Sequence, residues 1–201
     1  MENYILYGSG GHAKVVMECL SSENKVVEGF FDDASQSTHF QNLPNFGLYD
    51  NAKKPESFVL ITIGNNRIRQ LVSQKISHKF GASVFSHNII SPSVKISEGS
   101  MVLQGAVLNI GSVIGKHVII NTRAVVEHDC IIEDFVHLAP GSVVCGNCRI
   151  GEGTLIGANA VVAPNLTIGK WCQISAGSSV LEDIPDNSLV MGVPGKVIKT
   201  I

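Results

Sequence analysis

An aliphatic residue returns at every sixth position between Ile90 and Val180. A helix would repeat near 3.6 residues and a simple strand at about 2, so neither explains a period of six. Hexapeptide periods are typical of parallel β-helices, in which short strands wind round a prism and each coil stacks on the last. The pattern therefore predicts a β-helix. The sixteen positions are Ile90, Ile96, Val102, Leu108, Ile114, Ile120, Val126, Ile132, Leu138, Val144, Ile150, Ile156, Val162, Ile168, Ile174 and Val180.

A second, mostly small residue follows four positions after each of these aliphatic residues. A narrow prism needs one large and one small inward side chain on each face, and the two series supply both. Three hexapeptides make one coil, so the stretch predicts about five coils, each rising ~4.8 Å. Hexapeptide prisms usually wind left-handed, an exception to the rule for parallel connections. The small positions are Val94, Ser100, Ala106, Ser112, Val118, Ala124, Cys130, Val136, Ser142, Cys148, Thr154 and Ala160.

The chain before the repeats alternates short apolar runs with helical patterns. Their order predicts a small parallel α/β domain over residues 1–87, followed by the β-helix over 88–182 and a capping tail over 183–201. Strands are predicted at 4–7, 26–31, 57–63 and 82–85, and helical spacing links Ala13, Val16, Met17 and Leu20, and then Ile68, Leu71, Val72, Ile76 and Phe80.

Composition excludes several classes of protein. The net charge is −2 and no basic run is present, which argues against a nucleic-acid partner. No apolar run is long enough for a membrane span, and we expect a cytoplasmic protein without a membrane partner. The five cysteines are odd in number, which is typical of reduced thiols.

The first predicted turn contains Gly8-x-Gly10-x-x-Ala13, and Asp32 follows some twenty residues later. This pattern fits a dinucleotide-binding fingerprint. Because the domain is too short for two mononucleotide halves, a half-Rossmann domain that holds one nucleotide diphosphate at the helix N-terminus fits better. A purely structural turn is the alternative. His12 beside the glycines favours a ligand, since its imidazole could reach a phosphate or a sugar.

Cys145-x-x-Cys148 invites a zinc or redox interpretation. The sixfold register argues against it, because Cys130, Cys148 and Cys172 all fall on the small inward position. We therefore expect core packing and no metal.

The histidines separate into ordinary and chemical candidates. His117 is expected to be an ordinary surface residue. His128 lies between Glu127 and Asp129, and a carboxylate beside an imidazole fixes its tautomer and raises its basicity, as in a general base. A γ-type carbonic anhydrase is the zinc-dependent rival with the same prism. That family pairs two histidine ligands five residues apart, and no pair here has this spacing.

Motifs along the whole chain resemble the bacterial nucleotide-sugar acetyltransferases, which include UDP-4-amino-sugar N-acetyltransferases and sialic acid O-acetyltransferases. The motifs are Gly8-Ser-Gly-Gly-His12, Phe31-Asp-Asp33, Ile63-Gly-Asn-Asn66 with Arg69, Ser91-Pro-Ser93, Asn121-Thr, Glu127-His-Asp129, His137, Gly146-Asn, Ala163-Pro-Asn165 and Gly192-Val-Pro-Gly-Lys196.

This resemblance implies a homotrimer of left-handed β-helices that uses acetyl-CoA, with active sites between subunits. His128 would be the general base, and Asp129 would orient it, although Glu127 is an alternative partner. Asn121 would position the sugar. The Gly146 N–H would stabilise the thioester oxyanion and contact the cofactor, and His137 would contact its thiol end.

The resemblance also implies the two binding regions. Ala158, Ala176 and Gly177 would line the pantetheine channel, with Lys196 near the nucleotide end of CoA. Ala176 replaces a glycine of the family, a small change that should leave room. The nucleotide sugar would be held by Gly10, Gly11, His12, Asp32, Asp33, Gly64 and Asn65.

The leading hypothesis is an acetyl-CoA-dependent N-acetyltransferase that acts on the 4-amino group of a nucleotide-linked 4-amino-4,6-dideoxy sugar in surface glycan or glycoprotein sugar synthesis. UDP is favoured, with dTDP or GDP as alternatives. A sialic acid O-acetyltransferase is the second hypothesis, and a non-catalytic nucleotide-sugar scaffold is the third. No metal is required, because acyl transfer from a thioester needs only that amine and thioester are held together.

Overall fold

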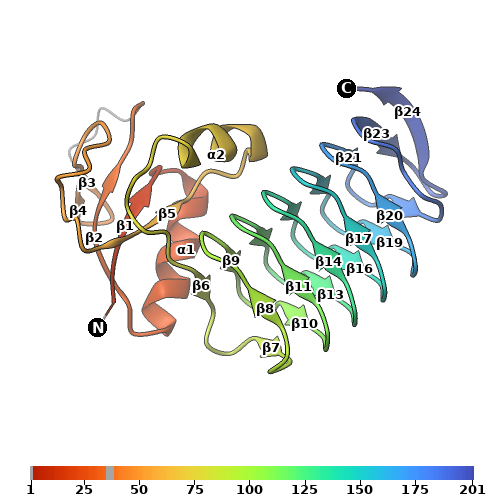
Figure 1. The fold of residues 1–201 in the computed structure, drawn as a ribbon, viewed down its shortest axis with the longest axis horizontal. Helices are drawn as coiled ribbons and strands as arrows, with labels where there is room; N and C mark the ends of the chain where they lie inside the picture. The colour runs from red at the N-terminus through yellow and green to blue at the C-terminus, as the bar shows by residue number, and fades with distance from the viewer. Residues whose placement is uncertain (1, 35–38) are drawn as a thin grey trace.

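A computed structural model describes residues 2–34 and 39–201, and Figure 1 shows a small α/β unit joined to a long β-helix. In the α/β unit, β1 (Asn3–Tyr7) lies between β2 (Val26–Phe31) and β5 (Phe58–Ile61) in a parallel three-stranded sheet. Strand β1 is a continuous apolar run because both faces of the sheet are covered. Its side chains alternate between two cores.

Two helices and a hairpin complete this unit. Helix α1 (Gly11–Ser22) follows β1 directly, and α2 (Asn66–Ser73) follows β5. Helix α2 ends earlier than the apolar pattern to Phe80 suggests. The hairpin of β3 (His39–Phe40) and β4 (Leu43–Pro44) lies beside β2.

Three parallel sheets form the β-helix, and we name them sheets I, II and III in the order in which the chain visits them. Sheet I contains β6 (Ser83–Val84), β9 (Met101–Val102), β12 (Ile119–Ile120), β15 (His137–Leu138), β18 (Leu155–Ile156) and β21 (Gln173–Ile174). Sheet II contains β7 (Ile89–Ile90), β10 (Val107–Leu108), β13 (Val125–Val126), β16 (Val143–Val144), β19 (Val161–Val162) and β22 (Ser179–Val180). Sheet III contains β8 (Lys95–Ile96), β11 (Val113–Ile114), β14 (Ile131–Ile132), β17 (Arg149–Ile150) and β20 (Thr167–Ile168).

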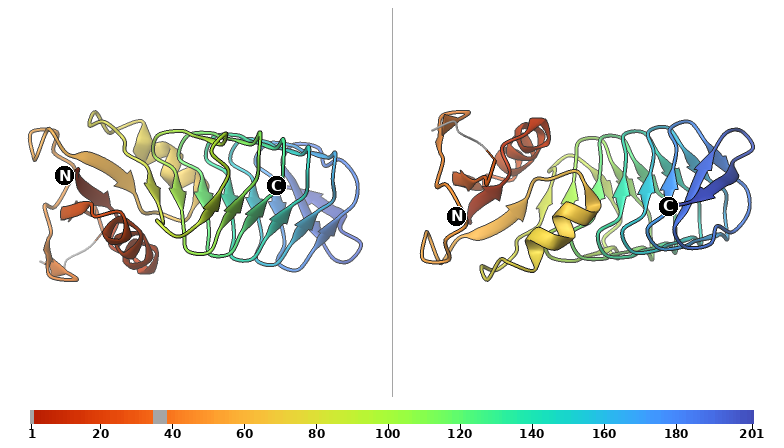
Figure 2. Two further views of the ribbon diagram at one scale, coloured as in Figure 1. Left: turned by 90° about the horizontal axis from the view of Figure 1, so that it is seen from below. Right: turned by 90° about the horizontal axis from the view of Figure 1, so that it is seen from above.

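The sixfold register explains the coil. The second residue of each short strand is the predicted aliphatic residue, and from Val102 onward all of these side chains are buried in one continuous core. At the turns, every sixth residue from Gly99 to Gly177 has a positive φ, which turns the chain sharply. Figure 2 shows the resulting stack, in which all coils turn at the same three edges. The predicted left-handed β-helix is confirmed.

The fourth predicted strand does form, as β6, but it pairs with β9 of sheet I and not with the sheet of the α/β unit. Val84 lies one period before Ile90, so the repeat begins one step earlier than expected and sheet I gains a strand. Sheets I and II therefore support about six coils where about five were expected. The apolar run alone could not distinguish these two partners.

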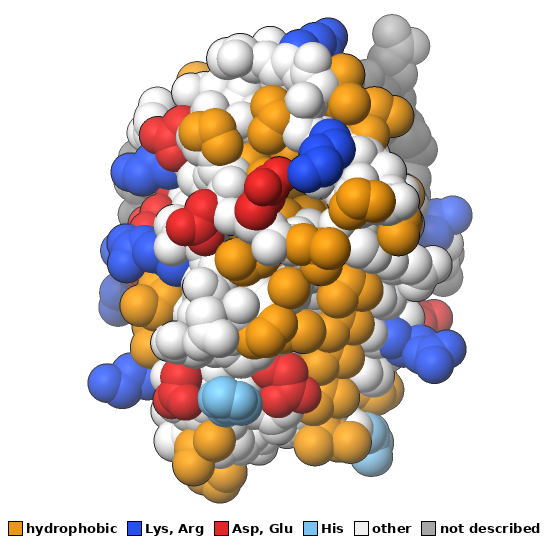
Figure 3. Space-filling model, turned by 90° about the vertical axis from the view of Figure 1, so that its right-hand side faces the viewer, with side chains coloured by type: hydrophobic (Ala, Val, Ile, Leu, Met, Phe, Trp, Pro, Cys, Tyr) orange, Lys and Arg blue, Asp and Glu red, His pale blue; other side chains and the backbone are white. Residues whose placement is uncertain are grey.

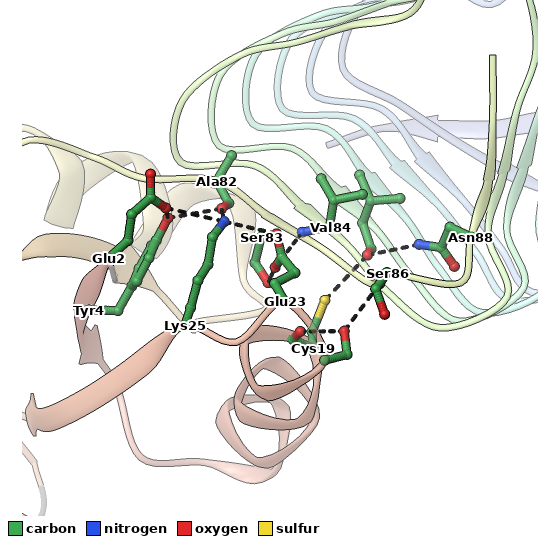
Figure 4. Close-up of polar contacts among 12 residues, drawn as sticks. Glu2, Tyr4, Cys19, Glu23, Lys25, Ala82, Ser83, Val84, Ser86 and Asn88 are labelled. Carbon is green, nitrogen blue, oxygen red and sulfur yellow. Dashed lines mark hydrogen bonds and ion pairs between the residues drawn. The ribbon is translucent and has the colours of Figure 1, made fainter. Parts of the chain in front are cut away.

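Polar contacts and a shared core fix the α/β unit to the first coils (Figure 4). Lys25 Nζ donates to the carbonyl of Ala82 at 2.9 Å, and Glu23 Oε1 accepts from the backbone N–H of Val84 at 2.9 Å. The Cys19 thiol donates to the carbonyl of Val102 at 3.5 Å. Met101 on sheet I is buried in the same core as α1. The outer surface of sheet I is therefore partly covered by the α/β unit.

The chain ends in a hairpin that extends sheet I. Strand β23 (Ser188–Met191) pairs in parallel with β21, and β24 (Lys196–Thr200) pairs antiparallel with β23. Figure 3 views the molecule from this end and shows hydrophobic side chains gathered across it. The exposed hydrophobic residues of the last coil and hairpin are Leu181, Met191, Val193, Val197, Ile198 and Ile201. No helix within residues 2–34 and 39–201 has the length and apolar character needed to cross a membrane.

Candidate active site

His128 lies at the edge between sheets II and III, which we call the II–III edge. Its Nδ1 is 2.9 Å from Oδ2 of Asp129, and both side chains are more than half exposed. Asp129 occupies a turn position with a φ of 58°, a conformation that Asp tolerates better than most residues. The turn places the carboxylate beside the imidazole. Of the two flanking carboxylates, only that of Asp129 is hydrogen-bonded to His128 in the described structure.

Gly146 lies one coil further along the same edge. A Cβ at this position would be 2.5 Å from Nε2 of His128, so only glycine leaves room for the ring. Its N–H donates to no acceptor among the described residues. His128, Asp129 and Gly146 are thus brought together, and the Nε2 edge of the imidazole packs against the Cα of Gly146.

Asn121 and His137 form a second cluster on sheet I. Asn121 follows β12 at the edge between sheets I and II, which we call the I–II edge, and His137 is the first residue of the neighbouring strand β15. The Asn121 Nδ2 is 3.1 Å from His137 Nε2, and His137 Nδ1 is 3.3 Å from the carbonyl oxygen of Gly64. Gly64 belongs to the loop that precedes α2, and the next residue, Asn65, caps that helix through its side chain. The loop of the α/β unit and the β-helix therefore meet at His137.

The histidines at this junction are held neutral. Burial, the Arg69 guanidinium and His12 lower the pKa of His137 to about 3. Burial and Arg69 likewise lower the pKa of His12 to about 4. The Nε2 atom of His12 is buried without a hydrogen-bond partner among the described residues. A neutral imidazole with an unused nitrogen is suited to a ligand that supplies the missing partner.

The glycine-rich turn leaves open space at the start of α1. Gly10 is the N-cap of α1, and a Cβ at Gly10 or Gly11 would meet nothing within 4 Å. Asp32 Oδ2 accepts hydrogen bonds from both the N–H and the hydroxyl of Ser9, at 2.9 and 2.5 Å. Asp33 Oδ2 accepts from the Tyr7 hydroxyl at 2.8 Å. Asp32 therefore braces the turn, and Asp33 is fixed to Tyr7 at the end of β1.

A shallow groove of about 420 Å³ runs along the I–II edge. Ala158 lies in it, and Ala176 and Gly177 occupy the turn of the next coil on the same edge. A narrow, flexible ligand arm would fit this line of small residues. Lys196 lies elsewhere, because its Nζ bonds Glu182 Oε1 at 3.0 Å after β22. The groove is lined by Thr122, Arg123, Pro140, Gly141, Ala158 and Asn159.

The predicted site residues are thus split between two edges of one prism. His128, Asp129 and Gly146 lie on the II–III edge. Asn121 and the groove lie on the I–II edge, and His137 contacts Asn121 from strand β15 of sheet I. The structure brings each group together but does not join the two groups within one chain.

The predicted core packing of three cysteines is confirmed, whereas the prediction for His117 is wrong. Cys130, Cys148 and Cys172 are buried in the β-helix core. His117 is also buried, with 4% of its surface exposed, because Phe80 of the α/β unit packs on its ring at 4.4 Å. Periodicity locates a turn but does not reveal what covers it. Among the described residues, no group of His, Cys, Asp or Glu side chains is arranged to hold a metal ion.

Arg69 is a junction residue that was not assigned to the site from the sequence, although it belongs to a motif quoted there. It is fully buried in α2 and contacts both the loop at Gly64 and the turn before His137. The sequence signal that could have identified Arg69 is a charged residue between the apolar positions 68 and 72 of a predicted helix. A second cavity of about 280 Å³ lies beside this loop, and Arg67 stacks on Trp171 there, with its guanidinium carbon 4.3 Å from the ring centroid.

Comparison with known protein families covers both parts of the chain. Residues 3–76 match the PglD N-terminal domain, and residues 111–146 and 147–181 match the bacterial transferase hexapeptide family. The structure is similar to the acetyltransferase domain of PglB from Neisseria gonorrhoeae, with a TM-score of 0.92 and 33% identity over 98% of this chain and 100% of that chain. The chain belongs to the hexapeptide-repeat nucleotide-sugar acetyltransferases.

Other members agree with this assignment, and the chain is an acetyltransferase. A mutant of perosamine N-acetyltransferase from Caulobacter crescentus, in complex with CoA and GDP-perosamine, gives a TM-score of 0.94 and 34% identity over 99% of this chain and 98% of that chain. GDP-perosamine N-acetyltransferase of Escherichia coli O157:H7 is 26% identical over 96% of this chain and 84% of that protein. The chain spans only 20% of a further match, protein L142 of Acanthamoeba polyphaga mimivirus, at 33% identity over 96 residues.

Proposed function

We propose that this acetyltransferase moves the acetyl group of acetyl-CoA to the 4-amino group of a nucleotide-linked 4-amino-4,6-dideoxy sugar. The observation that carries the proposal is the exposed His128 imidazole, which is hydrogen-bonded to Asp129 and packs against Gly146. The likeness to enzymes named for perosamine N-acetylation supports the amine as acceptor.

The geometry suits His128 as the general base. Because the Asp129 carboxylate accepts a hydrogen bond, the proton of the neutral ring lies on Nδ1 and Nε2 carries the lone pair. As the sugar amine attacks the thioester carbonyl carbon, Nε2 takes one of its protons. The C–S bond then breaks, the protonated ring can return the proton to the departing thiolate, and the products are the amide and free CoA.

The Gly146 N–H is a candidate donor for the oxygen that gains negative charge during this attack. A backbone donor costs no reorganisation because the coil fixes it in place. It is adjacent to Nε2 of His128, and so the base and the donor would flank the same carbonyl group. Such preorganised donors contribute on the order of 10²-fold or more to the rate of acyl transfer.

A homotrimer would join the two halves of the site. In this proposal the II–III edge of one subunit faces the I–II edge of the next, so that His128 of one copy meets Asn121, His137 and the groove of another. The groove would hold the pantetheine arm of acetyl-CoA along Ala158, Ala176 and Gly177, with Lys196 from the opposite edge near the nucleotide end.

The nucleotide sugar would occupy the open glycine turn. The N-terminus of α1 suits a diphosphate, and His12 follows its glycines directly. Gly64 and Asn65, in the loop before α2, would contact the sugar. Asp32 and Asp33 would accept donors from the ribose or the base. UDP is the proposed nucleotide, and GDP is the second candidate because two relatives are named for GDP-perosamine.

A thiol-release assay with acetyl-CoA tests this function. The acceptor panel contains UDP-, dTDP- and GDP-linked 4-amino sugars, the matching 4-hydroxy sugars and free sialic acid. We expect release of CoA only with a 4-amino sugar. Release with sialic acid and with none of the amino sugars would overturn the proposal.

A further inference from the structure

Arg69 is a buried cation bound entirely by neutral oxygens. It is 0% exposed, and its guanidinium donates to the carbonyls of His117 at 2.9 Å and Phe135 at 2.8 Å on the β-helix. On its own side it donates to the carbonyls of Ile63 at 3.0 Å and Gly64 at 3.3 Å, and to Oδ1 of Asn66 at 2.9 Å. All five acceptors are uncharged, so no carboxylate within residues 2–34 and 39–201 is hydrogen-bonded to Arg69 to offset the cost of burial.

The contacts of Arg69 converge on the backbone around His137. Phe135 precedes His137 by two residues, and the Gly64 carbonyl accepts from both Arg69 Nη1 and His137 Nδ1, each at 3.3 Å. The planar guanidinium thus fixes the position of the Gly64 carbonyl relative to the turn before His137. A lysine would supply the charge but not the fork that reaches both sides.

The shared carbonyl determines where the proton of His137 lies. A carbonyl only accepts, so Nδ1 of His137 carries the hydrogen, and the Nε2 of a neutral ring is then an acceptor. Asn121 Nδ2 donates to it at 3.1 Å, and Asn121 Oδ1 accepts from the N–H of Thr122 at 2.8 Å. In this series of hydrogen bonds each atom is either a donor or an acceptor and cannot exchange roles. The Asn121 amide therefore cannot flip without breaking its hydrogen bonds to His137 and Thr122.

We propose that Arg69 is a positioning residue whose guanidinium fixes the Gly64 carbonyl against Nδ1 of His137 and so sets the tautomer of His137 and the orientation of Asn121. Nε2 of His137 then accepts from Asn121 Nδ2 and has no hydrogen to donate to the acyl group. The link also connects the loop at Gly64, on the nucleotide side, to the I–II edge. The proposal rests on the proposed function only in that His137 and Asn121 face the acetyl-transfer site.

The low pKa of His137 supports this arrangement. Burial, Arg69 and His12 lower it to about 3, so the ring stays neutral across the working range of pH. The hydrogen bond to the Gly64 carbonyl raises the pKa of His137, since it favours a proton on Nδ1. Loss of the Arg69 charge should therefore raise the pKa of His137 and free its tautomer at the same time.

Two-bond ¹H–¹⁵N correlation spectra of histidine-labelled protein test the proposal without any acceptor substrate. We expect one Nδ1–H tautomer of His137 in the wild type. In Arg69→Met and Arg69→Lys we expect a mixture of tautomers, together with a fall in kcat/KM of roughly 10- to 100-fold. Gln70→Leu is the matched control, because it removes only the 2.9 Å bond from the same helix to Glu152 on the β-helix. It should lower the melting temperature without changing the tautomer.

An Nε2–H tautomer in the wild type would overturn the proposal, even if neither Arg69 variant folds. A single Nδ1–H tautomer that survives in a folded Arg69→Met protein would overturn it as well. Because these spectra need no acetyl transfer, they are independent of whether the proposed substrate is correct. If the enzyme proved inactive with amino sugars while the tautomer changed as expected, only the proposed function would fail.

Discussion

Nδ1 of His128 and Oδ2 of Asp129 lie 2.9 Å apart in one turn of the β-helix, on adjacent residues and at an open edge. The backbone turn creates this pair, since a φ of 58° at Asp129 brings its carboxylate alongside the preceding ring. The chemistry proposed here depends on that relation.

Removing the imidazole of His128 should abolish most of the activity. We expect His128→Ala to lower kcat by about 10²-fold or more, because the amine then loses its proton to water. Steady-state kinetics at saturating acetyl-CoA measure the effect. His87→Ala, at another exposed histidine that bonds Ser86, is the control and should keep wild-type kcat. A near-wild-type kcat for His128→Ala would remove the general-base assignment.

The two carboxylates beside His128 should differ in effect. Asp129→Asn tolerates the same backbone conformation but no longer fixes the Nδ1–H tautomer, so we expect kcat to fall ~10-fold or more. Glu127→Gln should have little effect, since Asp129 is the residue bonded to the ring. The same kinetic assay compares them, and a larger loss for Glu127→Gln would show that the wrong partner is assigned.

The Cβ added by Gly146→Ala should displace the His128 ring. This Cβ would lie 2.5 Å from Nε2, which forces the ring out of place while the backbone can accept alanine. We expect a loss of kcat of about 10-fold or more with an intact fold. In a double-mutant cycle, adding Gly146→Ala to His128→Ala should cost little further activity, because the clash has gone. Fully additive losses would mean that Gly146 acts independently of the ring.

Stability should fall as the solution becomes acidic. The folded-state pKa values of His12, His117 and His137 are lowered to about 4, about 4 and about 3, chiefly by burial. Between these values and about 6.5, the unfolded chain binds protons that the folded chain does not. The free energy of unfolding therefore rises with pH through this window.

Each of these histidines contributes a slope of up to about 1.4 kcal/mol per pH unit, so the three together give roughly 4 kcal/mol per unit. Urea denaturation at a series of pH values between 4 and 7 measures it. His117→Asn, which suits the positive φ at this position, should reduce the slope by about a third. A free energy of unfolding that is flat over this range would contradict the burial of these rings.

The sixfold repeat predicted the β-helix because each coil demands an inward aliphatic residue at the same place. It also assigned Cys130, Cys148 and Cys172 to the core, which separated packing from chemistry. The burial of His117 could not be predicted, since it depends on how Phe80 of the α/β unit packs on the β-helix. The pairing of β6 with β9 was missed, although Val84 lies one period before Ile90. The sixfold periodicity describes how each coil stacks on its neighbours, and it carries no information about how the α/β unit packs on the β-helix.

The site was predictable only in part for the same reason. The flanking carboxylates made His128 a candidate from three consecutive residues. By contrast, the hydrogen bonds that link Arg69, Gly64, His137 and Asn121 join segments that are far apart in sequence. They form only when the α/β unit packs on the β-helix.

The most direct test of the acetyl transfer is to identify the product. The enzyme is incubated with acetyl-CoA and, in parallel reactions, a UDP- or a GDP-linked 4-amino-4,6-dideoxy sugar, and each purified product is examined by mass spectrometry and NMR. We predict one added acetyl group and an amide proton coupled to the hydrogen at C4 of the sugar. An ester at a hydroxyl group, or recovery of UDP- and GDP-linked amino sugars unchanged, would contradict the account.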